Sequence, residues 1–447
     1  MLLTIEKQIY GGEGLARLPA DDKGRGKAVF VPFVLAGEKV ECSLVEQKPG
    51  FARAQLESIV EASPLRVEPG CPYFARCGGC DYQHASYQHQ LEIKKQILFE
   101  TLRRTAKLEL QNDIQVHASP PWNYRNRSRL QVRTTPEFAI GYFQRASHQL
   151  LPVENCPISS PLINRGIDCV WQSGRRGEVP LGGKEVEFFA DADDSKLLIE
   201  IYCAAESRRA SVRAWAEQLL ASMPEIAGVV AFRAKQAAGS RSATQETEKL
   251  VSVGADHLIY RTQRHAYRVS AGSFFQTNRF LIDKLIEIVT HGESGDLALD
   301  LYAGVGLFST ALCDIRHIVS VESSQTSTGD LTYNLPPNGK AVRAATEEFL
   351  ASAETSGRVG KGLASHLTTS HPDLAVVDPP RNGLGDRVAR RLANLGAPRV
   401  TYVSCDPATL ARDLVPLLAS GYRVDQVHLV DLFPQTYHLE TVVRLAR

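Results

Sequence analysis

Three segments of this 447-residue chain end in residue types that could act together on one ligand. A run of β-branched and aromatic residues ends in Cys405, and an Asp-Pro pair that starts a helix follows at once. A second apolar run, over 297–302, leads into Ala-Gly-Val-Gly, and a third, over 374–377, leads into Asp378-Pro-Pro-Arg. In an open parallel α/β sheet, ligands bind beyond the carboxyl ends of the strands. A thiol, a glycine turn and a carboxylate in one crevice predict a covalent group-transfer site.

The glycine turn is the first part of a candidate cofactor site. Gly304 and Gly306 follow an apolar strand and are expected to open a helix, since glycine lets the backbone turn tightly and approach a ligand. Ser309 stands where a dinucleotide-binding turn has its third glycine, which disfavours an NAD enzyme. Glu322 ends the next predicted strand, over 318–321, and could accept hydrogen bonds from ribose hydroxyls. An adenosine ligand without a diphosphate, S-adenosylmethionine, fits this pattern; the alternative for Glu322 is a simple charge at a helix start.

Cys405 is one of nine cysteines, and most single cysteines are inert core residues. It differs because it precedes a predicted helix start, where free amide groups and the helix dipole favour a thiolate. Asp406 is the expected N-cap, Pro407 the first helical residue, and the predicted apolar stripe continues along the helix. Four other cysteines are expected in inert apolar positions: Cys42, Cys169, Cys203 and Cys313.

A tight loop carries a cysteine trio with two glycines between its members. Cys71, Cys77 and Cys80 form the trio, and Cys156 is the candidate fourth ligand. Four thiolates suit either zinc or an iron–sulfur cluster, and the spacing alone leaves both open. An odd cysteine count without an export signal favours reduced thiols over disulfides, so we expect a cytoplasmic protein.

Composition is that of an ordinary globular protein, with 43% hydrophobic and 23% charged residues and no apolar run long enough to span a bilayer. The net charge of +1 excludes a general polyanion binder. Between residues 94 and 149, however, the sequence contains ten Lys and Arg but only four Asp and Glu, with aromatic residues interleaved. This pattern is typical of either a surface that holds phosphates and stacks bases or a solvated basic face with anchored aromatics.

The elements that would position these residues fall into three predicted domains. Residues 1–64 read as short strands separated by glycine turns, which indicates an OB-like barrel. Residues 65–270 are predicted to be a central α+β domain of short strands and turns, with a helix at about 88–104 that could pack against the catalytic domain. From 271 to 447, strand–helix alternation predicts an α/β, Rossmann-like domain. Exposed loops are expected over 237–248 and 355–370.

Five motifs, in this order along the chain, resemble those of the RNA uracil-5-methyltransferase family. The set comprises Phe274–Asn278, Asp300–Gly306, Asp378–Leu384, Ser404–Pro407 with Ala411-Arg412-Asp413, and His438–Glu440. Residues 1–64 look like the TRAM domain of that family, and Cys71–His84 resembles its iron–sulfur branch. The resemblance covers nearly the whole chain and implies an enzyme that methylates uracil C5 with S-adenosylmethionine.

The resemblance also implies a role for individual residues. Cys405 would be the nucleophile that adds to C6 of uracil, and Glu440 the base that removes the C5 proton. Leu307 departs from the asparagine usual at its position. The implied cofactor-binding residues are Gln276, Tyr302, Gly304, Glu322 and Asp378. The resemblance favours a 4Fe–4S cluster on Cys71, Cys77, Cys80 and Cys156.

The implied partner is RNA, with 23S ribosomal RNA favoured and the T-loop of transfer RNA as the alternative. A non-catalytic RNA-binding assembly factor is a further alternative, although an intact Cys405 and Glu440 favour the enzyme. A radical methylase is disfavoured because its usual Cys-x3-Cys-x2-Cys trio is absent from the sequence. No membrane partner is expected, and the expected oligomeric state is a monomer.

Overall fold

The N-terminal β unit predicted from glycine turns and β-branched runs is present in the computed structural model, which describes residues 1–19, 26–234, 247–355 and 371–447. Its six strands form one sheet in the order β1-β5-β6-β4-β3-β2. In β4 and β5 every second residue is buried at the start of the strand, so one face forms a small apolar core. The strands are β1 (Leu2–Thr4), β2 (Lys7–Gln8), β3 (Glu13–Arg17), β4 (Ala28–Pro32), β5 (Lys39–Gln47) and β6 (Phe51–Glu61).

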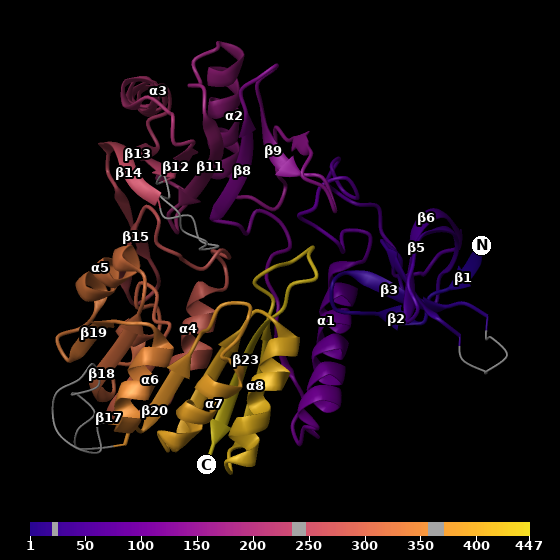
Figure 1. Ribbon diagram of the computed structural model, residues 1–447, viewed down its shortest axis with the longest axis vertical. Coiled ribbons are helices and arrows are strands. Elements are labelled where there is room, and N and C mark those ends of the chain that lie inside the picture. Colours follow the sequence, from indigo (N-terminus) through magenta and orange to yellow (C-terminus); the bar gives the residue numbers. More distant parts are fainter. Residues whose placement is uncertain (20–25, 235–246, 356–370) are drawn as a thin grey trace.

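The helix predicted at about 88–104 spans Tyr87–Thr101 (α1) and continues into a π-helical turn over Leu102–Ala106. Its buried residues Ile93, Ile97 and Leu98 join the core of the C-terminal sheet. In Figure 1, α1 lies beside α8 (Pro407–Ala419), and the two helices are in contact. The prediction that this helix of the segment 65–270 could pack against the C-terminal domain is therefore confirmed.

The central domain contains a seven-stranded sheet in the order β10-β9-β8-β11-β12-β13-β14. Apart from the helix at about 88–104, this domain was predicted to consist of short strands and turns, and this was wrong, because two helices cover the sheet (Figure 1). The signals for the first helix were present: Ser160 caps it by accepting a hydrogen bond from Ile163 N, Pro161 starts it, and apolar residues recur at helical spacing. The elements are β8 (Arg127–Arg133), β9 (Ala139–Phe143), β10 (Leu150–Pro152), α2 (Pro161–Arg175), β11 (Gly183–Ala190), β12 (Leu197–Cys203), α3 (Arg209–Ser222), β13 (Ile226–Ala234) and β14 (Thr247–Gly254).

Two loop predictions fall largely outside the described residues. The loop expected over 237–248 lies outside them up to residue 246, and its last two residues begin β14. The loop expected over 355–370 lies outside them from residue 356. A two-stranded hairpin, β15 (His257–Arg261) and β16 (Ala266–Ser270), then leads into the C-terminal domain.

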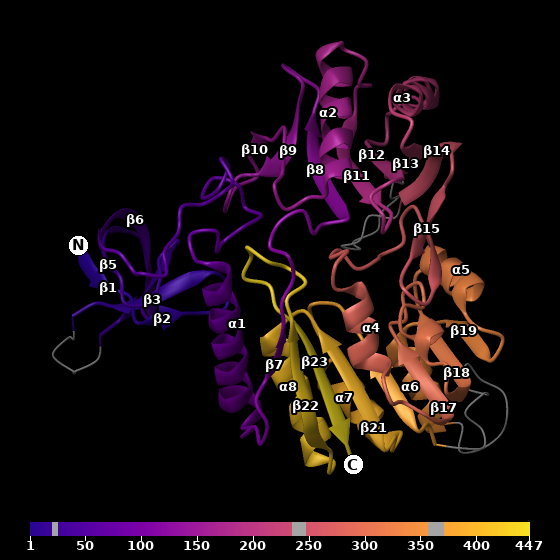
Figure 2. The ribbon, with the colours of Figure 1, turned by 180° about the vertical axis from the view of Figure 1, so that it is seen from behind.

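The C-terminal domain is built on an eight-stranded sheet in the order β19-β18-β17-β20-β21-β23-β22-β7. Its central strands are apolar runs buried on both sides, as expected for parallel strands covered by helices. Figures 1 and 2 show α6, α7 and α8 on one face and α4 on the other. The elements are α4 (Ile282–Thr290), β17 (Gly295–Leu301), β18 (Ile315–Glu322), α5 (Gln325–Asn334), β19 (Gly339–Arg343), α6 (Thr346–Thr355), β20 (Leu374–Val377), α7 (Gly385–Asn394), β21 (Arg399–Ser404), α8, β22 (Arg423–Val430) and β23 (Glu440–Ala446).

The strands predicted to end at residues 377 and 404–405 are confirmed, but two features of this sheet were not foreseen. The glycine turn after β17 leads only to a 3-10 turn over Ser309–Ala311, so the helix expected to open there was wrong. The sheet also gains an edge strand, β7 (Gln115–His117), which runs parallel to β22 although it lies more than 300 residues earlier.

Within the described parts of the chain, none of the helices combines the length and apolar character needed to cross a lipid bilayer.

Candidate active site

The residues singled out in the sequence gather at one edge of the C-terminal sheet. β18, β17, β20 and β21 are parallel neighbours, so the residues that follow them emerge side by side. Tyr302 follows β17, Glu322 ends β18, Asp378 follows β20 and Cys405 follows β21. Glu440 begins β23, which runs antiparallel to β21 and therefore starts at the same edge.

The glycine turn and Glu322 are joined by a hydrogen bond across the strand ends. Gly304 N donates to Glu322 Oε2 at 3.0 Å, and Ser324 N donates to Glu322 Oε1 at 2.6 Å. Gly304 has φ +55°, and a Cβ placed on it would meet no atom within 4 Å. Tyr302, with φ +63°, turns the chain just before this point. The turn thus leaves open space beside an oriented carboxylate.

Two carboxyl groups lie beside this turn: Asp300 is buried and Asp378 is half-buried. Asp300 Oδ2 accepts a hydrogen bond from Ser309 N at 3.1 Å and another from the Ser309 hydroxyl, while its Oδ1 has no partner within the described structure. Burial raises the pKa of Asp300 to about 7, although the Ser309 bonds oppose the rise. Burial and then the charge of Asp300 raise the pKa of Asp378 to about 7 as well. Ser309, which replaces a third glycine, therefore anchors Asp300.

Two further residues singled out in the sequence, Gln276 and Leu307, are both buried. Gln276 is buried in the segment between β16 and α4. Leu307 is buried in the apolar core on the α4 side of the sheet, and its carbonyl accepts a hydrogen bond from the Tyr267 hydroxyl at 3.0 Å. The side chain at position 307 thus contributes to packing.

The strand register brings Cys405 and Glu440 together. Ser404 pairs with Thr441 in the β21–β23 ladder, so Cys405 and Glu440 are the next residues at its open end. Glu440 is buried, at 3% exposure, and also pairs with Val430 of β22. A thiol and a carboxyl group that are 35 positions apart in the sequence therefore face the same crevice.

The helix predicted after Cys405 is confirmed in detail. Asp406 caps α8 by accepting hydrogen bonds from Ala408 N at 3.0 Å and Thr409 N at 2.9 Å, and Pro407 is the first helical residue. The predicted stripe is buried in the core between α8 and the sheet; it consists of Leu410, Leu414 and Leu417.

The expected thiolate is not supported by the surroundings of Cys405. Burial raises the pKa of the Cys405 thiol to about 12. The charges of Glu440 and Asp378 contribute to this rise after burial, and the Arg381 guanidinium opposes it. The helix start that was expected to lower the pKa is real, but burial and two neighbouring acids have the larger effect.

Four side chains at the mouth of the crevice come from three separate segments, and two of the four were missed in the sequence. Arg381 Nη2 lies 3.2 Å from His438 Nε2. Tyr437 packs on His438 and, edge to face, on Tyr10, with ring centroids 5.4 Å apart for the tyrosine pair. Tyr10 belongs to the N-terminal sheet unit and also lies beside Asp406. Nothing in the local sequence around Tyr10 or Tyr437 indicates this contact, because it depends on how the domains pack.

The four cysteines predicted as ligands also come together. All four are free thiols, and Cys80 lies in a small core with Tyr124, Ile158 and the half-buried Cys156. Burial raises the pKa values of Cys71, Cys77 and Cys80, and the Cys156 thiol is among the neighbours that raise each of them. Four neighbouring free thiols are the type of donor that thiophilic metal groups use once the thiols are ionised.

These thiols do not form a preformed site for a metal ion. In the described residues, no three His, Cys, Asp or Glu side chains converge closely enough to hold one metal ion. The four cysteines are neighbours in the fold, and the metal assignment stays a prediction from the sequence.

The arginines of the basic segment are mostly engaged within the protein. Arg127 is buried, donates to Glu200 Oε1 at 2.8 Å and also pairs with Glu187. Arg129 Nε donates to Glu187 Oε2 at 2.6 Å, and Arg145 pairs with Asp81. For these three arginines the contacts favour a structural role over direct contact with phosphates.

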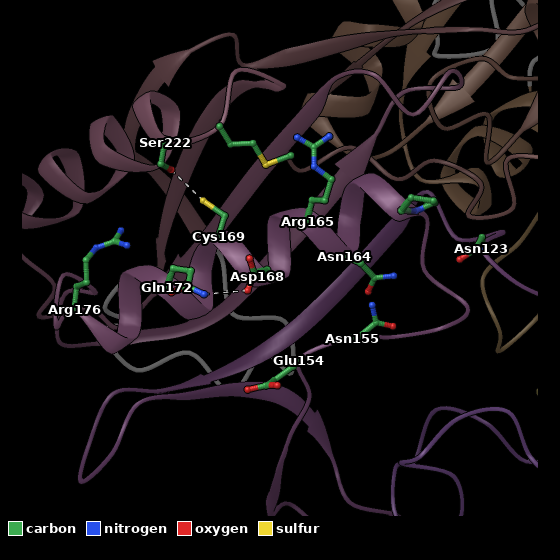
Figure 3. A pocket seen from close by; sticks show the side chains of 12 residues that line it. Asn123, Glu154, Asn155, Asn164, Arg165, Asp168, Cys169, Gln172, Arg176 and Ser222 are labelled. Carbon is green, nitrogen blue, oxygen red and sulfur yellow. Dashed lines mark hydrogen bonds between the residues drawn. The ribbon is translucent and has the colours of Figure 1, made fainter.

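A separate hollow of about 820 Å³ lies along α2 and is not part of the crevice (Figure 3). Its lining includes Cys169, whose Sγ lies 3.0 Å from Ser222 Oγ. Cys313 is exposed. The expectation of apolar surroundings was therefore wrong for Cys313, whereas Cys42 and Cys203 are buried as expected and Cys169 packs, half-buried, against the apolar core of the central domain.

Comparison with known proteins identifies the family. Residues 86–447 match the family model described as tRNA (Uracil-5-)-methyltransferase, and residues 1–56 match the TRAM domain. An uncharacterized RNA methyltransferase of Aquifex aeolicus is 30% identical over 446 residues, covering 99% of this chain and 97% of that protein. The 23S rRNA (uracil(1939)-C(5))-methyltransferase RlmD of Shewanella amazonensis is 29% identical, covering 98% of this chain and 94% of that protein.

Among solved structures, the fold is similar to that of Pyrococcus abyssi tRNA (uracil-54, C5)-methyltransferase in complex with S-adenosyl-L-homocysteine. The TM-score is 0.74 at 22% identity, and the match covers 99% of this chain and 100% of that chain. The family model covers most of the chain, including all five sequence motifs at the strand ends. The chain therefore belongs to the tRNA (uracil-5-)-methyltransferase family and is an RNA uracil-5-methyltransferase with an N-terminal TRAM domain.

Proposed function

We propose that this enzyme methylates C5 of a uridine in 23S ribosomal RNA, with S-adenosylmethionine as methyl donor and through a covalent adduct between Cys405 and uracil C6. The observation that carries the proposal is the β21–β23 register, which brings Cys405 and Glu440 to one end of the ladder beside the glycine turn. The proposed division of labour assigns residues 1–64 and 65–270 to RNA binding and residues 271–447 to catalysis.

The cofactor would bind over the glycine turn. The open space above Gly304 fits a ligand that approaches the backbone closely, and Glu322, which is held by that same turn, fits the ribose hydroxyls. Gln276, Tyr302 and Asp378 would complete the site. When bound, S-adenosylmethionine supplies an electrophilic methyl group. The relative from Pyrococcus abyssi was solved with the demethylated form of this cofactor, which supports the assignment.

Cys405 would activate the uracil ring, because C5 of uracil is a poor nucleophile by itself. As Sγ bonds to C6, the C5–C6 double bond opens and its electron pair becomes an enolate that makes C5 nucleophilic. The thiol is protonated in the free protein, so its proton has to leave as this bond forms. Asp378, whose charge also acts on the thiol, would accept this proton and return it to the thiolate after elimination, which leaves Glu440 ionised for the later step.

Glu440 would act after the methyl group has reached C5. It takes the C5 proton, the electron pair re-forms the C5–C6 double bond, and the C6–Sγ bond breaks to release the thiolate. Burial and then Asp378 raise the pKa of Glu440 well above the ordinary carboxyl range. Its ionised form is thus a stronger base than a solvated carboxylate, which suits removal of a proton from carbon.

Cys71, Cys77, Cys80 and Cys156 would hold a 4Fe–4S cluster with a structural or RNA-positioning role. The assignment is supported by four free thiols in one neighbourhood, since Cys156 acts electrostatically on each of the other three. Anaerobic purification with iron should yield a brown protein with about four irons per chain. Cys80→Ser should lose the colour, whereas Cys203→Ser, which changes a buried cysteine of the central sheet, should keep it. A colourless wild-type protein would count against the cluster.

Ribosomal RNA is favoured over transfer RNA by the relative named for 23S rRNA, which aligns over nearly the whole chain. The similar solved structure is named for a tRNA position, so the T-loop of transfer RNA is the second candidate. Incubating the enzyme with 23S rRNA and with tRNA from a strain lacking its gene, and mapping 5-methyluridine in each, would decide between them.

The covalent step is tested with RNA that carries 5-fluorouridine at the target position, because fluorine at C5 prevents the elimination step. Wild-type protein should form a complex that survives denaturation and maps to Cys405. Cys405→Ala should form no complex and show no turnover, while it still binds S-adenosylmethionine. Cys313→Ala is the matched control, since it removes an exposed thiol of the same domain. An adduct on another residue would rule out the mechanism.

A further inference from the structure

The loop between β22 and β23, residues 431–439, leads directly into Glu440 and is held from outside the C-terminal sheet. Figures 1 and 2 show this yellow loop rising from the sheet toward the central domain, beside the end of α1. We call it the β22–β23 loop. The residues that bind it come from α1, from the cysteine loop and from the TRAM unit.

Gln435, at the tip of this loop, has an unusual backbone that its neighbours stabilise. Its φ is +70°, in the left-handed region that residues other than glycine rarely adopt. Gln435 N donates to Gln90 Oε1 at 2.9 Å, and Gln90 Nε2 donates to Gln435 Oε1 at 2.9 Å. Both side chains are buried. Such a conformation persists only where surrounding contacts enforce it, and here α1 supplies two of them.

The cysteine loop supplies the remaining bonds to Gln435. Asp81 N and Tyr82 N both donate to Gln435 O at 2.9 Å. These two residues directly follow Cys80 in the chain. Asp81 is itself packed against Gly12 of the TRAM unit, where a Cβ would come within 2.8 Å of it. The position of the cysteine loop is therefore linked to the β22–β23 loop by main-chain hydrogen bonds.

The base of the loop is held by a buried ion pair. Lys94 Nζ donates to Asp431 Oδ1 at 2.6 Å and to Phe433 O at 2.9 Å, and the Tyr87 hydroxyl donates to Asp431 Oδ2 at 2.9 Å. Lys94 and Asp431 have almost no exposed surface. A pair buried this completely holds its partners in one geometry, because separating them would leave a charge without solvent or counterion.

The far end of the loop reaches the crevice. Tyr437 contacts Tyr10, His438 lies against Arg381, and Glu440 follows two residues later. A shift of the loop would therefore move the side chains that border the nucleophile. Effective proton transfer requires the base to be within hydrogen-bond reach of the proton that it removes.

We propose that Gln435 and Gln90 are positioning residues that align Glu440 for the elimination step, so that α1 and the cysteine loop act on catalysis through the β22–β23 loop. This inference rests on the proposed role of Glu440 as the base. It assigns no contact with RNA or cofactor to either glutamine. Its consequence is specific: loosening the loop should slow the last step more than the first.

The test compares Gln90→Met, which keeps side-chain length but removes both bonds to Gln435, with wild-type full-length protein. Trapping by 5-fluorouridine RNA reports the steps up to methyl transfer, whereas turnover of ordinary RNA also requires elimination. Gln90→Met should trap at a rate within about twofold of wild type but lose on the order of 10- to 100-fold in kcat. The adduct with ordinary RNA should accumulate on denaturing gels.

The matched control is Tyr422→Phe, which removes a buried hydroxyl that donates to Ala397 O at 2.7 Å elsewhere in the same domain. It should leave both rates unchanged. Tyr87→Phe keeps α1 intact and removes the bond to Asp431, together with the bond that the hydroxyl accepts from Ser119 N. It should show the same pattern as Gln90→Met to a smaller extent, and it provides the test if Gln90→Met does not fold.

Two results would overturn the inference: an unchanged kcat in the folded variants, or trapping and kcat that fall by the same factor. Failure of the proposed function looks different, because wild-type protein itself would then form no adduct at Cys405.

Discussion

The protonation state of Cys405 can be tested directly by alkylation. Its surroundings raise the pKa of the thiol from 9.0 to about 12. Because the thiolate is the reactive form, this rise lowers the reactive fraction about a thousandfold at any pH well below 9. We therefore expect Cys405 of the free enzyme to react slowly with iodoacetamide at neutral pH and its rate to keep rising up to the highest pH at which the protein stays folded.

The assay follows each cysteine-containing peptide by mass spectrometry between pH 6 and pH 10. Cys313, which is exposed, serves as the internal reference in the same digest. Glu440→Gln removes the neighbour with the largest electrostatic effect on Cys405. Since one nearby carboxylate shifts a pKa by about one unit or more, alkylation of Cys405 in this variant should be about tenfold faster at pH 9. A rate that levels off below pH 9 in wild-type protein would refute the reasoning and favour a thiolate stabilised by α8.

Three further predictions concern stability and pH. Burial raises the pKa of Asp300 from 3.8 to about 7, so the contribution of its neutral carboxyl group to the stability of the fold is present below pH 4 and is lost as pH rises through 7. In urea unfolding, Asp300→Asn should therefore be more stable than wild type at pH 8, by up to about 4 kcal/mol, but not at pH 4.5. Arg127→Met leaves Glu200 buried without its arginine partner and Glu187 with Arg129 alone, so it should cost about 3–5 kcal/mol of unfolding free energy, whereas the salt dependence of RNA binding by the folded variant should not change. Lys94→Met should cost a similar amount, and adding Asp431→Leu should restore most of it; a double variant no more stable than the single one would contradict a buried ion-pair penalty.

The C-terminal domain was the most predictable part of the fold. Apolar runs such as 374–377 are buried on both faces, and their ends were visible because Asp378-Pro-Pro cannot continue a ladder. The start of α8 was equally clear, since Asp406 and Pro407 supply the cap and first residue that a helix needs. In the central domain the same cap-and-proline signal at Ser160-Pro161 was present but was overlooked among strand-like segments.

The pKa of Cys405 was predicted in the wrong direction for a physical reason. The local sequence shows a helix start, which lowers the pKa of a thiol, but not the burial and the two acids that raise it. Glu440 becomes a neighbour only through antiparallel pairing of the last strand, and Asp378 only through the order of parallel strands. The ion pairs of the arginines in the basic segment could not be predicted from the local sequence either, since their carboxylate partners lie on other strands.

The sequence by itself determined which residues could do the chemistry, because motif spacing and strand ends are local properties of the chain. It also indicated the order of the three domains and the family. Only the tertiary structure decided which groups share one environment: Cys405 with Glu440, Tyr10 with Tyr437, and Gln435 with Gln90 and the cysteine loop. Charge–charge effects, burial and backbone strain depend on distances across the fold. When two residues are more than 300 positions apart, the local sequence around neither of them indicates that they are in contact.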